Sequence, residues 1–192
     1  DDFLARMLNI ARGIVIGDPQ DDATEMGPLC TLGQIEHIER QVTLAIEEGG
    51  RLLCGGRRLA RPGLFFEPTI IECPRQDMTI VDTELFGPVL AVQRFRTEAE
   101  VVALANDTKH GLAAGLFTRD GARQLRLAKA LKSGMVWVNT YRMISPIAEF
   151  GGVKTSGHGR EAGLQAMYDY TRAKTIWVNL SDDPIANPFQ PR

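Results

Sequence analysis

Apolar residues recur three or four positions apart in two segments of the first fifty residues. The first segment contains Phe3, Leu4, Met7 and Leu8. This spacing predicts a helix that ends before Gly17-Asp18-Pro19. A second apolar stripe runs from Ile35 to Ile46 and stops at Gly49-Gly50. Thr31 and Gln34 have capping-box spacing, so we expect this second helix to begin at Thr31.

Further along, short apolar segments alternate with helical patterns. The strand candidates are 51–54, 69–72, 89–95, 113–118 and 135–139. Thr97 and Glu100 form a second capping-box pattern, which opens a helix to about Asn106. Another helix is expected across Leu125 to Leu131. From residue 89 the order is strand, helix, strand, helix, strand. This order predicts an α/β fold with one parallel sheet and helices on its faces.

The last fifty residues change character. Residues 141–159 contain Pro146 and four glycines with little periodicity. Irregular segments at the ends of parallel strands often carry ligand sites in α/β proteins. A helix is expected from about Arg160 to Met167, then a strand from Thr175 to Leu180. The last twelve residues hold three prolines and are expected to form a loose tail.

Composition excludes several classes of protein. With 22 basic and 24 acidic residues the net charge is -2, so no basic surplus points to nucleic acid or an anionic membrane. No apolar run approaches the roughly 20 residues of a membrane-spanning helix. Three scattered cysteines fit a reducing compartment, and we expect a cytoplasmic protein. The chain starts within a helical pattern, so we expect a preceding segment, which could also carry a targeting signal.

Several local patterns do not support a function by themselves. Residues 157–162 fit G-x-G-x-x-A, but no strand leads into Gly157, as a dinucleotide site requires. The three histidines lack metal-ligand spacing, so no metal site is predicted. Of the cysteines, only Cys30 lies near a predicted helix start. Incidental or buried cysteines are the simplest interpretation, although a reactive local cysteine would define a different enzyme class.

The segment from Asp82 to Val89 places an acid and an aromatic residue before a Gly-Pro turn and a buried strand. On physical grounds alone these residues fit a β-turn with Phe86 in the core and Glu84 in solvent. The same segment resembles the E-x-F-G-P signature of the aldehyde dehydrogenases. Four other segments resemble motifs of that family in the same order, namely 63–69, 106–114, 134–139 and 150–161.

The resemblance covers roughly residues 1 to 180 and implies part of an NAD(P)-dependent enzyme that oxidises an aldehyde to a carboxylic acid. In this family a cysteine thiolate attacks the aldehyde carbonyl to give a thiohemiacetal, and hydride then passes to NAD(P). A glutamate activates the water that hydrolyses the thioester. The family's nucleophile motif, general base and cofactor-binding domain do not occur in this sequence, so no catalytic residue is assigned here.

Carried over by position, the resemblance implies a role for each of six residues. Glu84 would bind the nicotinamide ribose hydroxyls, since a carboxylate accepts two hydroxyl hydrogen bonds. Phe86 would lie against the nicotinamide, and Gln34 would touch the adenosine side of the cofactor. Phe150 would line the aldehyde tunnel.

The remaining two, Arg142 and Ile144, belong to the wall formed by residues 142–148, which would select the substrate. Both residues differ from those of common relatives, so the resemblance does not identify which aldehyde is the substrate. Glu36 and His37, next to Gln34, depart from the lysine-rich pattern of many relatives.

The resemblance also predicts how the chain is divided and assembled. Residues 1–170 would be the carboxy-terminal part of the catalytic domain. Residues 171–192 would hold an oligomerisation strand and a loose tail, because the short apolar strand at 175–180 would otherwise be an unpaired edge. The alternative for this strand is a local hairpin with Met135–Asn139. We therefore expect a homo-oligomer that acts on an aldehyde. The alternative is a free-standing binding or assembly module that has the same fold and no chemistry.

Overall fold

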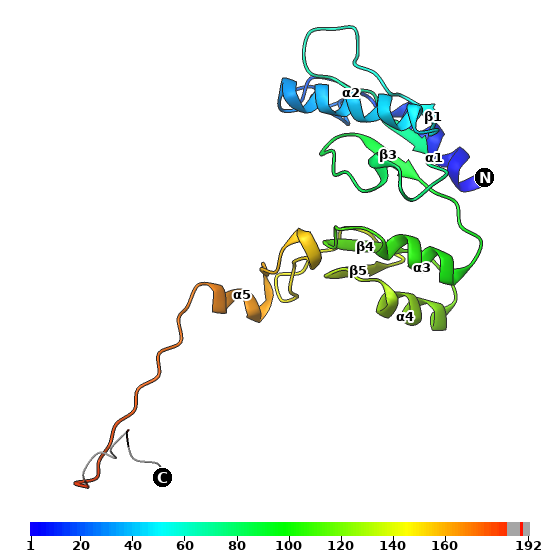
Figure 1. Ribbon diagram of the computed structural model, residues 1–192. Coiled ribbons are helices and arrows are strands. Elements are labelled where there is room, and N and C mark those ends of the chain that lie inside the picture. Colours follow the sequence, from blue (N-terminus) through cyan, green and yellow to red (C-terminus); the bar gives the residue numbers. More distant parts are fainter. Residues whose placement is uncertain (184–188, 190–192) are drawn as a thin grey trace.

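The computed structural model describes residues 1–183 and residue 189. Figure 1 shows two lobes followed by an extended segment; we call residues 1–95 the first lobe and residues 96–170 the second lobe. The first lobe contains α1 (Asp2–Gly13), α2 (Leu32–Glu47), β1 (Arg51–Cys54), β2 (Thr69–Glu72), the 3-10 turn η1 (Thr79–Val81) and β3 (Val89–Val92). The second lobe contains α3 (Glu98–Asn106), β4 (Ala113–Leu116), α4 (Gly121–Ala130), β5 (Met135–Val138), the 3-10 turn η2 (Lys154–Ser156) and α5 (Gly163–Asp169).

A three-stranded sheet in the order β1-β2-β3 supports the first lobe. β1 is antiparallel to β2, and β2 is parallel to β3 with Thr69 opposite Val89. The predicted stripe on α2 is buried against this sheet and η1, as the helical spacing requires. The core comprises Ile35, Ile38, Val42, Ala45, Phe66, Ile71, Cys73, Met78 and Ile80.

The start of α2 is confirmed, but its cap differs from the prediction. The Thr31 side chain accepts a hydrogen bond from the Gln34 backbone N–H at 3.2 Å, as expected of an N-cap. The Gln34 side chain does not complete the box on Thr31, because its oxygen accepts from the Cys30 N–H at 3.3 Å. The Gln34 side chain therefore binds the residue before the N-cap and not the N-cap itself.

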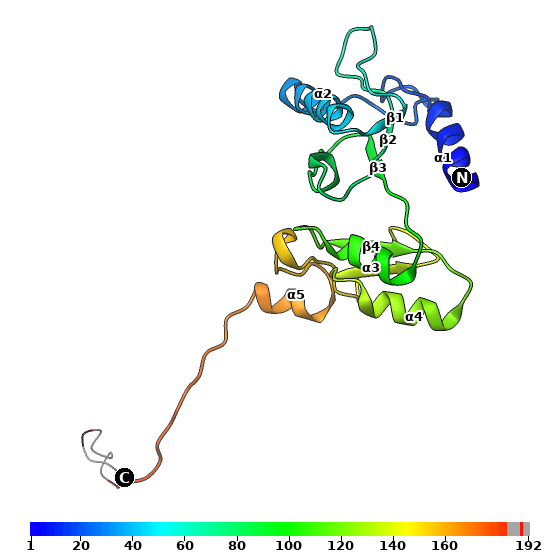
Figure 2. The same ribbon diagram turned by 45° about the vertical axis from the view of Figure 1, so that its right-hand side comes forward.

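The second lobe rests on a parallel pair of strands, with Ala113 of β4 opposite Met135 of β5. Figure 2 shows α3 and α4 beside this pair, and α4 contacts both strands. α3 begins with the predicted capping box, since Thr97 and Glu100 bond each other's backbone N–H. All ten buried hydrophobic residues of the described chain lie between residues 35 and 80. The second lobe therefore has no buried core of its own.

Parallel strands with flanking helices are present as predicted, but the strands from residue 89 onward do not belong to one sheet. β3 pairs with β2 of the first lobe, and β4 pairs only with β5. The alternation of patterns predicts which segments are strands but leaves their neighbours undetermined. The strands also end earlier than expected, at Val92, Leu116 and Val138.

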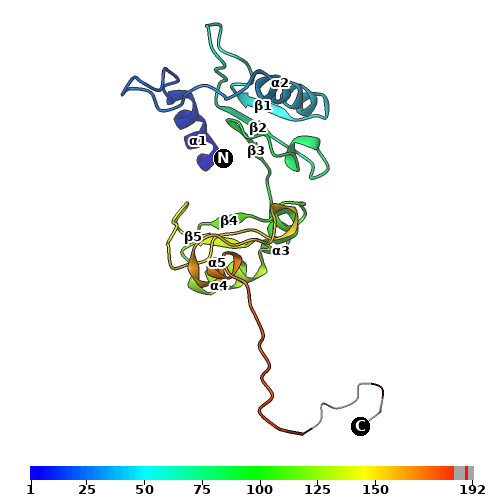
Figure 3. The same ribbon diagram turned by 90° about the vertical axis from the view of Figure 1, so that its left-hand side faces the viewer.

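The carboxy-terminal helix is displaced from its expected bounds. α5 begins at Gly163 and not at Arg160, because Glu161 pairs with Phe150 and Ala162 has a left-handed backbone with φ of +60°. Beyond α5 the chain runs away from both lobes (Figure 3). The predicted strand at 175–180 has no strand partner in the described chain. Most of the predicted loose tail, residues 184–188 and 190–192, lies outside the described residues.

Candidate active site and its neighbours

Glu84 and Phe86 project from the loop between η1 and β3. Both side chains are exposed, and Phe86 retains 75% of its accessible surface. The alternative in which Phe86 is part of the core is therefore wrong. Phe86 also has a left-handed backbone with φ of +48°, which is uncommon for a residue with a Cβ. A strained turn thus holds an acid and an aromatic ring toward solvent, two residues apart.

Gln34 supports this turn from α2. Its side-chain N–H donates to the backbone carbonyl of Phe86, while its oxygen accepts from Cys30. The structure therefore brings together two of the predicted site residues, Gln34 and Phe86, which are 52 positions apart in the sequence. Through these two hydrogen bonds Gln34 fastens the turn to the amino-terminal end of α2.

Glu84 lies at a small cavity that it shares with the second lobe. The cavity has a volume of about 180 Å³. It is lined by Glu84 together with Ala105, Asn106, Thr108, His110, Gly111, Leu112, Ala113, Ala114, Leu131, Lys132, Ser133 and Ser156. Glu84 thus shares this cavity with Ala113 and Ala114 of β4 and with the basic residues His110 and Lys132.

The predicted substrate wall follows the carboxyl end of β5, as expected for an α/β ligand site. Trp137 donates from its indole N–H to the Met143 carbonyl at 2.9 Å, and its ring meets Tyr141 edge-on at 5.3 Å. Arg142 is exposed with φ of +59°, and Ile144 is also exposed. A tryptophan on the strand therefore anchors a loop on which Arg142 and Ile144 are exposed.

Phe150 is half-buried. It exchanges two 2.7 Å backbone hydrogen bonds with Glu161. Residues 151–159 form a glycine-rich loop. Arg160 closes this loop by donating to the Gly152 carbonyl at 2.8 Å. The segment before Gly157 is η2 and not a strand, which agrees with the rejection of a dinucleotide fingerprint there.

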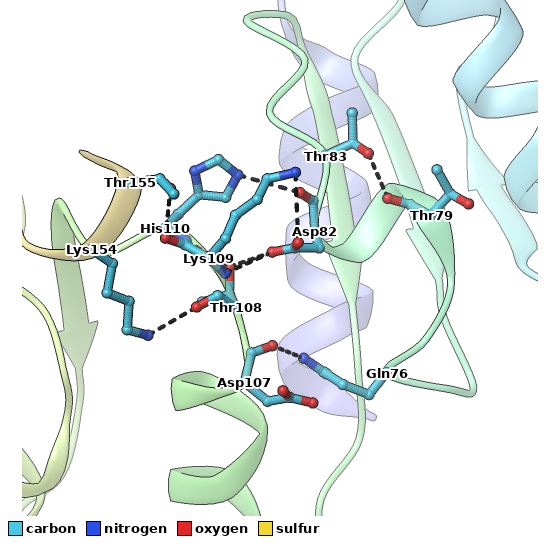
Figure 4. A network of polar contacts seen from close by, with 10 residues as sticks. All are labelled: Gln76, Thr79, Asp82, Thr83, Asp107, Thr108, Lys109, His110, Lys154 and Thr155. Carbon is cyan, nitrogen blue, oxygen red and sulfur yellow. Dashed lines mark hydrogen bonds and ion pairs between the residues drawn. The ribbon is translucent and has the colours of Figure 1, made fainter. Parts of the chain in front are cut away.

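Sequence reasoning missed a polar network that lies between the two lobes (Figure 4). It lines a cleft of about 590 Å³, and its central residues are Asp82, Thr108 and Lys154. Hydrogen bonding to Thr108, then to the Lys109 N–H, holds the pKa of Asp82 below its usual value. The signal was present in the sequence, because Asp82 stands two residues before Glu84 and Lys154 lies in the glycine-rich loop.

The three cysteines differ in exposure. Cys73 is buried, Cys54 is half-buried and Cys30 is exposed. Burial raises the pKa of Cys73, the opposite of what a nucleophilic thiol needs. In residues 1–183 and 189 there is no group of three or more potential metal ligands. Within the same residues, none of the helices is long and apolar enough to cross a membrane.

The sequence profile of the aldehyde dehydrogenase family matches residues 1–176. Among curated relatives, (Z)-2-((N-methylformamido)methylene)-5-hydroxybutyrolactone dehydrogenase of Acinetobacter baylyi is 48% identical over 98% of this chain and 39% of its own length. Betaine aldehyde dehydrogenase of Cereibacter sphaeroides is 43% identical over 97% of this chain and 38% of its own length. The chain therefore spans about two fifths of the curated relatives it matches.

Solved structures agree with the sequence matches. Betaine aldehyde dehydrogenase from Staphylococcus aureus superposes with a TM-score of 0.92 at 37% identity, over all of this chain and 39% of that one. The NAD+ complex of aldehyde dehydrogenase from Bacillus cereus gives a TM-score of 0.89 at 38% identity, over 93% of this chain and 36% of that one.

Proposed function

Because the chain belongs to the aldehyde dehydrogenase family, we propose that it is the carboxy-terminal part of an NAD(P)-dependent enzyme that oxidises an aldehyde to a carboxylic acid. The family match over residues 1–176 carries this proposal. The alternative of a free-standing assembly module gains no support from the curated relatives reported above, which are named as dehydrogenases.

The residues present fit a nicotinamide cofactor. Glu84 offers an exposed carboxylate beside a cavity, which suits two ribose hydroxyls. Phe86 offers an exposed ring on a turn that Gln34 holds in place, which suits a flat aromatic group. Gln34 thus positions Phe86 in the cofactor site. It would also contact the adenosine side of the cofactor. When bound, NAD(P) supplies the hydride acceptor.

The aldehyde is proposed to meet a wall formed by residues 142–148, with Phe150 lining the tunnel. Arg142 and Ile144 face outward on the loop that Trp137 anchors, so they are free to contact a substrate. Phe150 is fixed by its pairing with Glu161, which suits a residue that must keep a constant tunnel shape.

The bond-making groups are proposed to lie outside these 192 residues. A cysteine thiolate would form the thiohemiacetal, and a glutamate would activate the water that hydrolyses the thioester. Cys73 does not suit the first role, because it is buried and burial raises its pKa. This chain would therefore orient the reactants and leave the covalent chemistry to the rest of the enzyme.

Residues 1–170 are proposed to complete the catalytic domain, and residues 171–192 to serve assembly. The segment Thr175–Leu180 carries exposed Ile176, Trp177 and Val178 in succession. Apolar β-prone residues without a partner are normally covered or paired. We propose that this segment adds to a sheet of another subunit in a homo-oligomer.

A Glu84→Gln substitution in the complete enzyme tests the proposed function. The neutral amide loses one of the two acceptor oxygens, so the nicotinamide would sit less accurately while most binding contacts remain. A misplacement near 1 Å costs about 100-fold in rate, and we expect a loss of that order in single-turnover hydride transfer. We expect a smaller change in cofactor affinity, measured by fluorescence titration.

Glu47→Gln is the matched control, because Glu47 is exposed on α2 of the same lobe and the change removes the same charge. It should leave hydride transfer unchanged. If Glu84→Gln transfers hydride as fast as the parent enzyme, the proposed role of Glu84 is wrong.

A further inference from the structure

The two lobes meet through a small set of polar contacts. Within residues 1–170, every hydrogen bond from one lobe to the other runs from Gln76 or Asp82 to residues 104–110. We call residues 107–110, between α3 and β4, the junction loop. Figure 4 shows Asp82 on one side of this loop and Lys154 on the other. The loop therefore touches segments from both lobes at once.

Asp82 anchors the junction loop to the segment that carries Glu84. Its carboxylate accepts from the Thr108 hydroxyl at 2.6 Å and from the Lys109 N–H at 3.1 Å. The Lys109 ammonium lies 3.6 Å from its second oxygen, and the His110 ring lies 3.3 Å from its backbone carbonyl. These contacts fix the backbone two residues before Glu84. The lowered pKa of Asp82 means that the charged, accepting form persists in the folded protein.

Lys154 anchors the same loop to the segment that carries Phe150. Its ammonium donates to the carbonyls of Asn106 at 2.9 Å and Thr108 at 3.0 Å, where a cation suits the carboxyl end of α3. The neighbouring Thr155 adds two hydrogen bonds to the Lys109 carbonyl. Lys154 has φ of +57°, a strained conformation for a residue with a Cβ, which the surrounding contacts must maintain.

We propose that the junction loop couples the cofactor site to the aldehyde tunnel, with Asp82 and Lys154 as positioning residues on its two sides. This inference rests on the proposed function, since it takes Glu84 and Phe150 as the groups being positioned. Neither Asp82 nor Lys154 touches a reactant. Each acts by holding the same four-residue loop, so a shift of that loop moves both sites together.

The test uses Asp82→Ala, Lys154→Met and the double variant in the complete enzyme. Asp82→Ala should slow single-turnover hydride transfer about 10-fold or more, because Glu84 loses its anchor. Lys154→Met should raise the KM for the aldehyde about 10-fold, because Phe150 loses its anchor. In kcat/KM for the aldehyde, the double variant should lose less than the product of the two single losses, since both residues act through one loop.

Conservative changes separate positioning from simple loss of folding. Asp82→Asn retains an acceptor oxygen, and Lys154→Arg retains a cationic donor, so each should restore most of the lost rate or affinity. Asp77→Ala is the control at the same cleft, because Asp77 is exposed and pairs with Arg75 outside the junction loop. It should leave both measurements unchanged.

The outcomes distinguish this inference from the proposed function. If Glu84→Gln slows hydride transfer while folded Asp82→Asn, Asp82→Ala and Lys154→Met variants match the parent, the coupling is wrong and the proposed function stands. If the single losses multiply in the double variant, the two anchors act independently and the coupling is also wrong. If Glu84→Gln itself has no effect, the proposed role of Glu84 is wrong, and so is the inference that Asp82 acts by positioning it.

Discussion

At the scale of single residues, backbone strain is concentrated around the proposed site. Phe86, Arg142 and Lys154 all have φ between +48° and +59° without being glycine. Such conformations cost roughly 1–3 kcal/mol each and persist only where the surroundings determine them. Gln34 supplies that support for Phe86, and the Lys154 side chain supplies it through two carbonyls. The strain therefore marks positions whose orientation is fixed by tertiary contacts.

A glycine next to the glycine-rich loop is expected to be intolerant of any side chain. A Cβ added at Gly134 would lie 1.8 Å from the carbonyl oxygen of Gly151. Gly134→Ala should therefore push β5 and this loop apart, at a cost of roughly 1–3 kcal/mol or more. We expect a lower Tm for the complete enzyme by differential scanning fluorimetry.

Gly121→Ala is the matched control for that change. Gly121 begins α4 and has no atom within 4 Å of an added Cβ, and alanine favours a helix more than glycine does. The Tm should stay the same or rise. An unchanged Tm in Gly134→Ala would contradict the close approach of the two backbones.

At the scale of elements, helix starts are local features and depend on few residues. The capping box of α3 joins Thr97 to Glu100, and an aspartate caps α4 through the Arg123 N–H at 3.0 Å. α3 has no buried residue, so tertiary packing contributes little to its stability in this chain. The contacts at its two ends therefore contribute more to its stability. These are the capping box at Thr97 and the hydrogen bond from Lys154 to the Asn106 carbonyl.

Thr97→Ala should loosen α3. Removing an N-cap hydroxyl costs about 1 kcal/mol, which is about a 5-fold change in a local opening equilibrium. Amide hydrogen exchange followed by mass spectrometry should therefore be about 5-fold faster in peptides that cover residues 98–106. Thr43→Ala is the control, since Thr43 is exposed inside α2 and its hydroxyl only bonds the Glu39 carbonyl behind it. Equal exchange in parent and Thr97→Ala enzymes would show that the box does not stabilise this helix.

At the scale of the whole molecule, the chain exposes far more surface than a globular protein of its size. Its accessible surface is 14218 Å² at 21.2 kDa. A folded monomer of that mass exposes about 9,100 Å² by the usual scaling with mass. The excess includes Phe117 and Leu125 in the second lobe and Trp177 in the tail, which is 92% exposed. So many exposed large apolar side chains indicate that other protein surfaces cover them. This agrees with the proposal that the chain is part of a larger enzyme.

Deleting residues 173–192 from the complete enzyme should reduce its oligomeric state. The deletion removes the apolar run from Ile176 to Leu180, which we propose to pair with another subunit. Light scattering after size exclusion would report a lower mass. A shorter deletion of residues 184–192 keeps that run and should keep the parent's mass. If the longer deletion leaves the mass unchanged, the segment is not an assembly element.

The isolated 192-residue chain should not oxidise aldehydes with NAD or NADP. Loss of a catalytic nucleophile and base costs several powers of ten in rate, and both groups are proposed to lie outside this chain. Absorbance at the reduced-nicotinamide band would follow the reaction, with the complete enzyme as the positive control. Reproducible turnover by the purified chain would overturn the assignment of the chemistry.

The sequence by itself determined the elements, because periodicity and caps are local. The stripe from Ile35 to Ala45 and the box at Thr97 appear where the pattern predicts them, and five strands begin at the predicted residues. Three of these strands end earlier than predicted, and the segment 175–180 is not a strand in the described chain. The motif around Glu84 likewise pointed to the family before any contact was known. Local sequence patterns do not predict which strands pair. The pairing of β3 with β2, and of β4 with β5 alone, was therefore not predictable from them.

Only the tertiary structure decided how the candidate residues are held. It exposed the Phe86 ring, joined Gln34 to the Phe86 carbonyl across 52 positions and placed Asp82 and Lys154 on one loop. The physical reason is that hydrogen bonds between distant segments, and the strained backbones they maintain, depend on which elements pack together. Hydrophobic periodicity carries no information about those contacts.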